Sequence, residues 1–165
     1  MTLSTERTGA LARPASALLA GCLALGACDP GRGELPDEVE VTNVIASSSS
    51  GFIMEGCASV IYRLHPATAN KVTKQGLAFF ERVESLRKSD RYSDWKETPI
   101  LGAEAKHILA LRAIRGCEKT EEEPSARAIR EALQTRGSFY AITDNREGMI
   151  FVAPRANLAA FFYLG

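Results

Sequence analysis

The sequence predicts an α+β domain in which an antiparallel sheet of four to five strands carries two to three helices on one face. Three observations lead to this class. The C-terminal part holds three short apolar segments joined by tight turns. Residues 54–64 carry apolar or small side chains at every second position. The stretches between these regions place apolar residues three and four positions apart. The first two observations predict strands, and the third predicts helices that cover the sheet.

The C-terminal segments give the clearest strand signal. Residues 138–143 (SFYAIT), 149–153 (MIFVA) and 158–164 (LAAFFYL) are rich in β-branched, aromatic and small apolar residues. The intervening sequences DNREG and PRAN have turn chemistry, so the three strands should form an antiparallel meander. We expect the last strand to be central or covered, because an exposed strand of this apolar character is prone to aggregation.

Two further strands are predicted near the start of the domain. Residues 39–46 (VEVTNVIA) are rich in β-branched residues, and the run SSSSG at 47–51 is interpreted as a break after this strand. Residues 54–64 place Met, Gly, Ala, Val, Tyr and Leu at alternate positions, which indicates a strand with one buried face. Cys57 falls between those positions and should lie on the opposite face.

A helix is predicted to begin at Pro66, because proline suits the first helical position and the His65 ring can cap the helix. Apolar or small residues then follow at spacings of three and four and form one stripe: Ala69, Val72, Gly76, Phe79, Val83 and Leu86. Glycine is unfavourable in a helix interior by about 1 kcal/mol. Gly76 therefore marks either a close contact or a break into two helices.

A long polar loop is predicted over residues 88–102 (KSDRYSDWKETPILG). It holds Tyr92 and Trp95 among charged residues. Exposed aromatic side chains in such a loop are candidate contacts for a partner. The alternative is that Trp95 folds back over the core.

Two more helices are predicted after this loop. Residues 103–115 carry an apolar stripe that ends at Gly116. Pro124 opens a second helix, which runs to Arg136 and ends at Gly137.

Cys57 and Cys117 are the two cysteines of the predicted domain. In an oxidising compartment two such cysteines most often form a disulfide. This one would close a loop of about sixty residues, which the chain-entropy relation converts to about 4 kcal/mol of stabilisation. Two alternatives stay open: both cysteines are inert buried thiols, or Cys57 is a reactive thiol beside His65 or His107.

The first residues of the chain have the character of a targeting segment. Arg7 and Arg13 make the start weakly basic, and residues 15–27 contain no charged side chain. This apolar stretch has the length of a signal-peptide core. It is too short to span a membrane, which takes about twenty residues.

The sequence LLAGCLALGAC at 18–28 resembles the lipobox of bacterial lipoproteins, in which an apolar residue and two small residues precede a cysteine. Two registers fit, Leu19-Ala20-Gly21-Cys22 and Leu25-Gly26-Ala27-Cys28. Cleavage before Cys28 uses the whole apolar stretch, whereas cleavage before Cys22 leaves a core of only about seven residues, so Cys28 is favoured. The resemblance implies a signal peptide over residues 1–27, cleavage before the cysteine and a diacylglycerol on its thiol.

The lipobox has two alternatives, an ordinary secretory signal cut after Gly26 or Ala27 and an internal apolar helix. The resemblance implies a lipid-anchored protein of the cell envelope that faces the periplasm, and Asp29 resembles the signal that keeps some lipoproteins in the inner membrane. Residues 28–38 (CDPGRGELPDE) are rich in Pro, Gly and charge and are expected to form a flexible tether. A single α+β domain then occupies residues 39–165.

The composition and motifs of the chain argue against several classes of function but do not assign one. The chain has 20 basic and 20 acidic residues, so no basic face for nucleic acid or anionic lipid is predicted. Membrane attachment should come from the lipid alone. No phosphate-binding glycine loop, serine nucleophile elbow or zinc motif occurs in the sequence, so no cofactor or metal is expected.

Three functions are considered on this basis. The leading hypothesis is a non-catalytic envelope domain that binds a protein or a small ligand. The first alternative is a small periplasmic hydrolase that uses His65 or His107 with a carboxylate. The second is an inhibitor or immunity-type protein that blocks an envelope enzyme through the loop that holds Tyr92 and Trp95.

Overall fold

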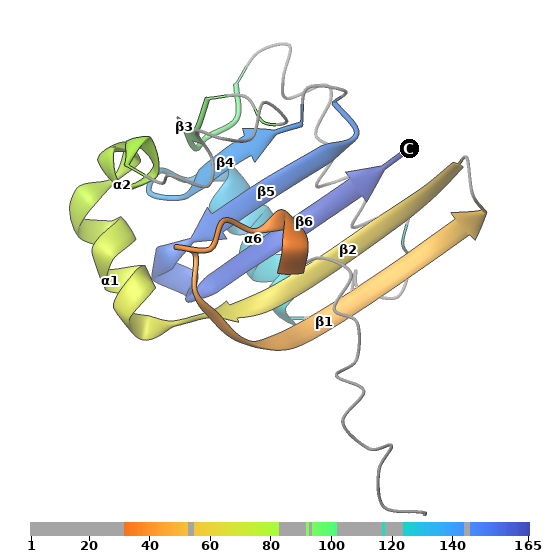
Figure 1. Cartoon of the computed structure of the whole chain (residues 1–165), viewed down its shortest axis with the longest axis horizontal. Helices are drawn as coiled ribbons and strands as arrows, with labels where there is room; N and C mark the ends of the chain where they lie inside the picture. The colour runs from red at the N-terminus through yellow and green to blue at the C-terminus, as the bar shows by residue number, and fades with distance from the viewer. Residues whose placement is uncertain are drawn as a thin grey trace, which may run out of the picture.

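The computed structural model describes residues 32–52, 55–82, 92, 94–101, 117, 124–143 and 146–165. It contains a six-stranded sheet in which every neighbouring pair is antiparallel, in the order β1-β2-β6-β5-β4-β3 (Figure 1). The strands are β1 (Val41–Phe52), β2 (Glu55–Leu64), β3 (Lys96–Glu97), β4 (Phe139–Ile142), β5 (Gly148–Ala153) and β6 (Leu158–Leu164). The α+β class is confirmed, with one strand more than the largest number expected.

The C-terminal meander is confirmed almost residue for residue. Strands β4, β5 and β6 pair in sequence order, and a short 3-10 helix, η3 (Pro154–Ala156), joins the last two. Asn157 completes that turn with a φ of 53°, a left-handed conformation that asparagine tolerates better than most residues. Strand β6 lies between β2 and β5, and its residues 158–162 are buried. The most apolar strand therefore occupies a central position, as expected.

Strand β1 corrects the prediction of a break at the serine run. It continues to Phe52, and Ser47–Ser50 pair with Val60–Cys57 of β2. Polar residues are accepted here because β1 is the edge strand of the sheet, so its backbone gains the β2 hydrogen bonds while the serine side chains stay largely accessible. The local composition indicated a turn, but the ladder with β2 decides the conformation.

Strand β2 is buried on both faces, not on one. Val60, Tyr62 and Leu64 belong to one buried cluster, whereas Ile61 belongs to a second cluster. Side chains alternate between the two faces of a strand, so Cys57 lies on the Ile61 side, opposite Val60, as predicted. Helices must therefore cover both sides of this strand.

The first helical region confirms the predicted start and one of the two alternatives for Gly76. Helix α1 (Pro66–Gln75) begins at Pro66, and His65 caps it by accepting a hydrogen bond from the backbone N–H of Ala67 at its Nδ1 atom, over 3.2 Å. Gly76 has a φ of 59°, which residues with a side chain rarely adopt. The chain breaks there, and a separate short helix, α2 (Leu77–Glu81), follows.

Helix α6 (Pro124–Gln134) begins at the predicted proline and ends shortly before Gly137, whose φ is 99°. It buries Ala126, Ile129 and Leu133 at helical spacing. The helix predicted over 103–115 and the end of the first apolar stripe, at 83–86, lie outside the described residues.

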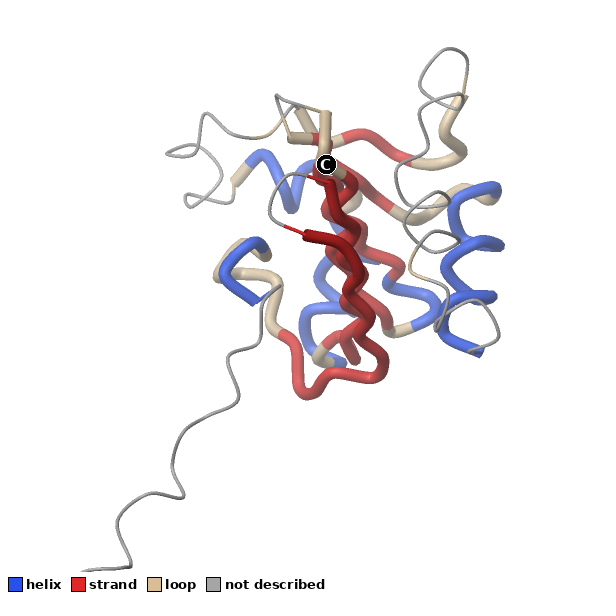
Figure 2. The backbone as a smooth tube through the Cα atoms, turned by 90° about the vertical axis from the view of Figure 1, so that its right-hand side faces the viewer, coloured by secondary structure: helices blue, strands red, loops and turns tan. Residues whose placement is uncertain are grey.

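The helices cover both faces of the sheet, which corrects the expectation that they share one. Figure 2 views the sheet edge-on and shows helices on either side of the strands. Helices α1 and α2 pack with the cluster that contains Val60 and Tyr62, and α6 packs with the cluster that contains Ile61. The reason lies in strand β5, where all six residues are buried, so both of its faces carry apolar side chains that need a cover.

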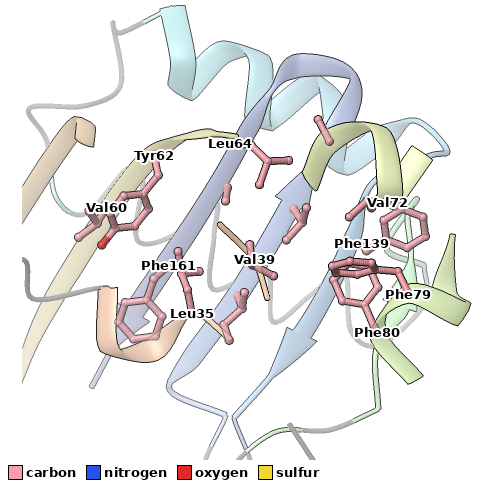
Figure 3. Packing of buried hydrophobic residues seen from close by; sticks show 14 residues of the cluster. Leu35, Val39, Val60, Tyr62, Leu64, Val72, Phe79, Phe80, Phe139 and Phe161 are labelled. Carbon is pink, nitrogen blue, oxygen red and sulfur yellow. The ribbon is translucent and has the colours of Figure 1, made fainter. Parts of the chain in front are cut away.

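A segment at the start of the described chain also packs on the α1 and α2 face. We call residues 32–40 the N-terminal strap; it begins with the 3-10 helix η1 (Arg32–Glu34). Leu35 and Val39 are 4% and 0% exposed and belong to the same cluster as Phe161 (Figure 3). The expected tether over 28–38 is therefore wrong from residue 32 onward, because two apolar side chains in a polar sequence are enough to dock it on the sheet.

Leu35→Ala tests whether the strap belongs to the cooperative fold. We expect the free energy of unfolding to fall by about 2–4 kcal/mol, since the variant removes a buried side chain and leaves a cavity. Urea denaturation followed by circular dichroism measures this change. Leu101→Ala is the matched control, because Leu101 is 72% exposed and its loss should change stability by at most about 0.5 kcal/mol. Equal effects of the two variants would contradict the docked strap.

Candidate functional site

A cavity of about 280 Å³ opens beside the junction of α1 and α2. Its lining comes from five elements of the fold: α1, α2, β3, the start of β4 and η3. The lining residues are Thr73, Gly76, Leu77, Glu97, Gly137, Phe139 and Arg155. The break at Gly76 therefore contributes directly to the cavity, since it ends α1 at the rim.

Two opposite charges lie at this cavity. Glu97 and Arg155 are both exposed, and they form no ion pair with each other within the described chain. The Glu97 carboxylate accepts a hydrogen bond from the backbone N–H of Gly137 over 3.1 Å. The guanidinium of Arg155 covers the same glycine, because a Cβ atom at Gly137 would lie 3.2 Å from Arg155 Cζ. Both charged groups thus lie next to Gly137, and Glu97 is hydrogen-bonded to it.

The apolar part of the cavity is formed by Phe139, which is 5% exposed. Its ring packs on Phe80, with a centroid distance of 5.3 Å. The Thr73 hydroxyl donates to the carbonyl of Ala69 over 2.8 Å and is thereby engaged within α1. The cavity combines an acceptor, a donor and an apolar wall, an arrangement that suits binding of a small molecule with both charges.

Trp95 lies against the core. Its ring stacks on Phe80 with a centroid distance of 3.9 Å and an interplanar angle of 12°, and it packs on the cluster of the α1 and α2 face. This is the alternative in which Trp95 folds back. Its buried Nε1 atom has no hydrogen-bond partner among the residues that the structure describes. Engagement of a partner by this loop stays a prediction.

Tyr92 connects three distant segments. It forms an isolated β-bridge with Thr143, and its phenol donates a 2.6 Å hydrogen bond to the Glu34 carboxylate of the strap. The predicted contact residue thus holds the strap against the domain.

The structure contains the disulfide between Cys57 and Cys117, with a Cα–Cα distance of 6.0 Å. The two cysteines are 7% and 1% exposed. Strand β1 supports this bridge, since Ser48 Oγ donates to the Cys117 carbonyl over 2.9 Å and Ser50 Oγ lies 3.1 Å from Cys57 Sγ. The reactive-thiol alternative for Cys57 is therefore wrong for this oxidised structure, because its sulfur is in the disulfide bond.

His65 contacts both the helix that follows it, α1, and the strap that precedes β1. Besides capping α1, its Nδ1 atom lies 3.8 Å from Glu40 Oε2, and its backbone N–H donates to the Glu40 carbonyl. These contacts fix the end of the strap to the start of α1. His107, Cys22 and Cys28 lie outside the described residues.

Among the described residues, neither a metal centre nor a membrane-spanning helix is found. Among the residues that the structure places, no cluster of three or more His, Cys, Asp or Glu side chains could hold a metal ion. Likewise, no helix in that part of the chain is long and apolar enough to cross a membrane.

Sequence reasoning did not single out the cavity. Glu97 and Arg155 are far apart in the chain and occur in short polar stretches with no recognisable motif. They meet because β3 pairs with β4, while η3 follows β5 at the same end of the sheet. No signal in the sequence could have found this pairing without the tertiary structure.

Comparison of the chain with protein-family models, with curated proteins and with solved structures found no match. A function for this protein must therefore be inferred from its residues and from their arrangement.

Proposed function

We propose that this protein is an exported lipoprotein, anchored in the cell envelope by a lipid on Cys28, with a non-catalytic domain that binds a small ligand. The observation that carries the anchor is the apolar segment 15–27 with its small residues directly before Cys28. The Cys57–Cys117 disulfide supports export, because disulfides persist in oxidising compartments such as the periplasm. Cys22 is the alternative lipidation site.

The anchor is tested by the intact mass of the full chain expressed in a Gram-negative host and extracted from its membranes. We expect a mass that begins at Cys28 plus a diacylglycerol, with a gain of two hydrogens when the disulfide is reduced. Cys22→Ser is the matched control, since it should leave this mass unchanged if residue 22 belongs to the removed peptide. An unlipidated mass with free thiols would overturn the proposal.

The ligand that fits the cavity best is a small zwitterion. A ligand ammonium group can approach the Glu97 carboxylate, and a ligand carboxylate can accept from the Arg155 guanidinium. Phe139 and Leu77 supply apolar surface to the lining of the same cavity. The volume of about 280 Å³ lies near the lower end of the range for ligand cavities, so it suits a small ligand such as a dipeptide.

Dialanine is a suitable probe, with its N-acetyl and C-amide derivatives as ligands that each lack one charge. We expect nuclear magnetic resonance titration to show binding of the zwitterion and weaker binding of both derivatives. Glu97→Gln and Arg155→Gln should each weaken binding by up to about fivefold, since both side chains are exposed and an exposed ion pair contributes about 0.2–1 kcal/mol. The glutamine at position 97 retains an acceptor for the Gly137 N–H.

Arg127→Gln is the matched control for Arg155→Gln. Arg127 is also exposed, but it lies on α6 and does not line the cavity. Failure of dialanine to bind, or equal affinity in wild type and both cavity variants, would remove the ligand-binding part of the proposal. The lipid anchor would be unaffected by that result.

A further inference from the structure

The folded domain begins close to the proposed lipidation site. The strap is fixed to the sheet by Leu35 and Val39, by the Tyr92–Glu34 hydrogen bond, and by the hydrogen bond from the His65 N–H to the Glu40 carbonyl. Its first residue, Arg32, belongs to η1. Only residues 29–31 separate Arg32 from Cys28.

This spacing limits how far the domain can stand from a membrane. Four virtual bonds link Cys28 to Arg32, and a fully extended chain of that length spans at most about 14 Å. As a flexible coil its root-mean-square reach is about 11 Å. Both distances are smaller than the domain itself, whose diameter is about 35 Å for a chain of this size.

The strap also determines which side of the domain is closest to the anchor. Figures 1 and 2 place η1 on one side of the sheet and α6 on the other. Helices α1 and α2 and the Trp95 ring share the cluster of the strap, whereas α6 belongs to the opposite cluster. We call the side of the sheet that carries the strap, α1 and α2 the strap face, and the opposite side the α6 face. A short link at Arg32 therefore brings the strap face, and not the α6 face, towards the bilayer.

The charge of the strap does not provide this proximity. The strap contains four acidic side chains and one basic side chain, Arg32, so it is repelled by anionic headgroups. The short covalent link must hold the domain there against that repulsion. Its closeness to the membrane should consequently depend on linker length and not on attraction between the domain and lipid.

We propose that the lipidated protein holds its strap face directly against the phospholipid headgroups of the anchoring membrane, and that α6 faces away from it. This inference rests on the proposed function, because it requires the lipid on Cys28. It limits the binding partners of the domain to molecules at or near that membrane surface. A domain on a long tether could instead reach across the envelope.

The single tryptophan, Trp95, allows a direct test because it lies on the strap face. The full lipidated protein is reconstituted in vesicles of phosphatidylethanolamine and phosphatidylglycerol that contain dansyl-labelled headgroups. Energy transfer from Trp95 to dansyl reports the distance of this face from the membrane. A twelve-residue Gly/Ser insertion between Gly31 and Arg32 is the test variant, and the same insertion after Gly165 is its matched control.

We expect strong transfer in the wild type and in the C-terminal control, with little change when salt is raised. The insertion before Arg32 should lower transfer about twofold or more, since the root-mean-square reach of the link doubles from about 11 to about 22 Å. Low transfer that the insertion does not change, with the lipid on Cys28 shown by mass, would overturn the inference and leave the lipoprotein proposal intact.

Two other outcomes separate the inference from the function on which it rests. Lipid on Cys22 would also overturn direct apposition, because nine residues would then separate the lipidated cysteine from Arg32, while the protein would still be a lipoprotein. A protein without lipid would remove both proposals.

Discussion

Replacing Cys57 and Cys117 together by alanine is expected to lower the free energy of unfolding by about 4 kcal/mol. The disulfide joins residues that are 60 apart in sequence, and a cross-link over a loop of that length removes much conformational freedom from the unfolded chain. Both sulfur atoms are buried, so the variant also loses packing beneath β1. Urea denaturation followed by Trp95 fluorescence measures the shift in midpoint.

Reduction of the wild type provides the control for this double variant. A reductant should bring the wild type to nearly the stability of the variant and should leave the variant unchanged. Equal midpoints for the oxidised wild type and the variant would show that the bridge does not constrain the unfolded chain. A large effect agrees with a protein that folds in an oxidising compartment.

Phe162→Ala is expected to lower the free energy of unfolding by about 3–5 kcal/mol. Phe162 is fully buried at the centre of the sheet, where it pairs with Ser59 of β2 and Met149 of β5. Its ring belongs to the cluster beneath α6, so its loss leaves a cavity between the central strand and that helix. Urea denaturation followed by circular dichroism measures the loss.

Tyr163→Ala is the matched control, because it removes the next aromatic side chain of the same strand. Tyr163 is 36% exposed, and its hydroxyl makes only a long 3.5 Å hydrogen bond to Glu147. Its loss should cost less than about 1 kcal/mol. If both variants were equally destabilised, Phe162 would not fill the buried cluster beneath α6 while Tyr163 stays exposed.

The two proposals concern the same side of the molecule. The cavity is lined by α1, α2 and Phe139, which belong to the side of the sheet on which the strap packs. A domain held with that side towards the membrane would bind ligands close to the headgroups. Ligand binding and membrane proximity can nevertheless be tested separately, because the cavity variants do not touch the linker.

Local patterns predicted the elements whose conformation depends on neighbours in the sequence. Pro66 and Pro124 marked helix starts because proline fits the first helical turn, and Gly137 marked a helix end. Gly76 indicated either a close contact or a break, and its positive φ shows that it is a break. The C-terminal meander was predictable because its tight turns leave consecutive strands only one way to pair. The disulfide followed from the number of cysteines in the domain.

Patterns that depend on distant partners were misread. The serines of β1 indicate a turn by composition, yet they pair with β2 at the edge of the sheet. The strap has the composition of a flexible linker, yet Leu35 and Val39 fill space on the sheet that no local rule could show. In both cases the segment is stabilised by its contacts with residues that are distant in the sequence.

The sequence by itself determined the class of the fold, its central strands, its helix starts and the candidate anchor, because each of these is encoded within a few neighbouring residues. Only the tertiary structure decided that helices cover both faces, that the chain is docked from residue 32, and that Glu97 and Arg155 share one cavity. Those features depend on which strands become neighbours. The order β1-β2-β6-β5-β4-β3 places the N-terminal hairpin next to the last strand, and this long-range pairing is selected by burial of both sheet faces together.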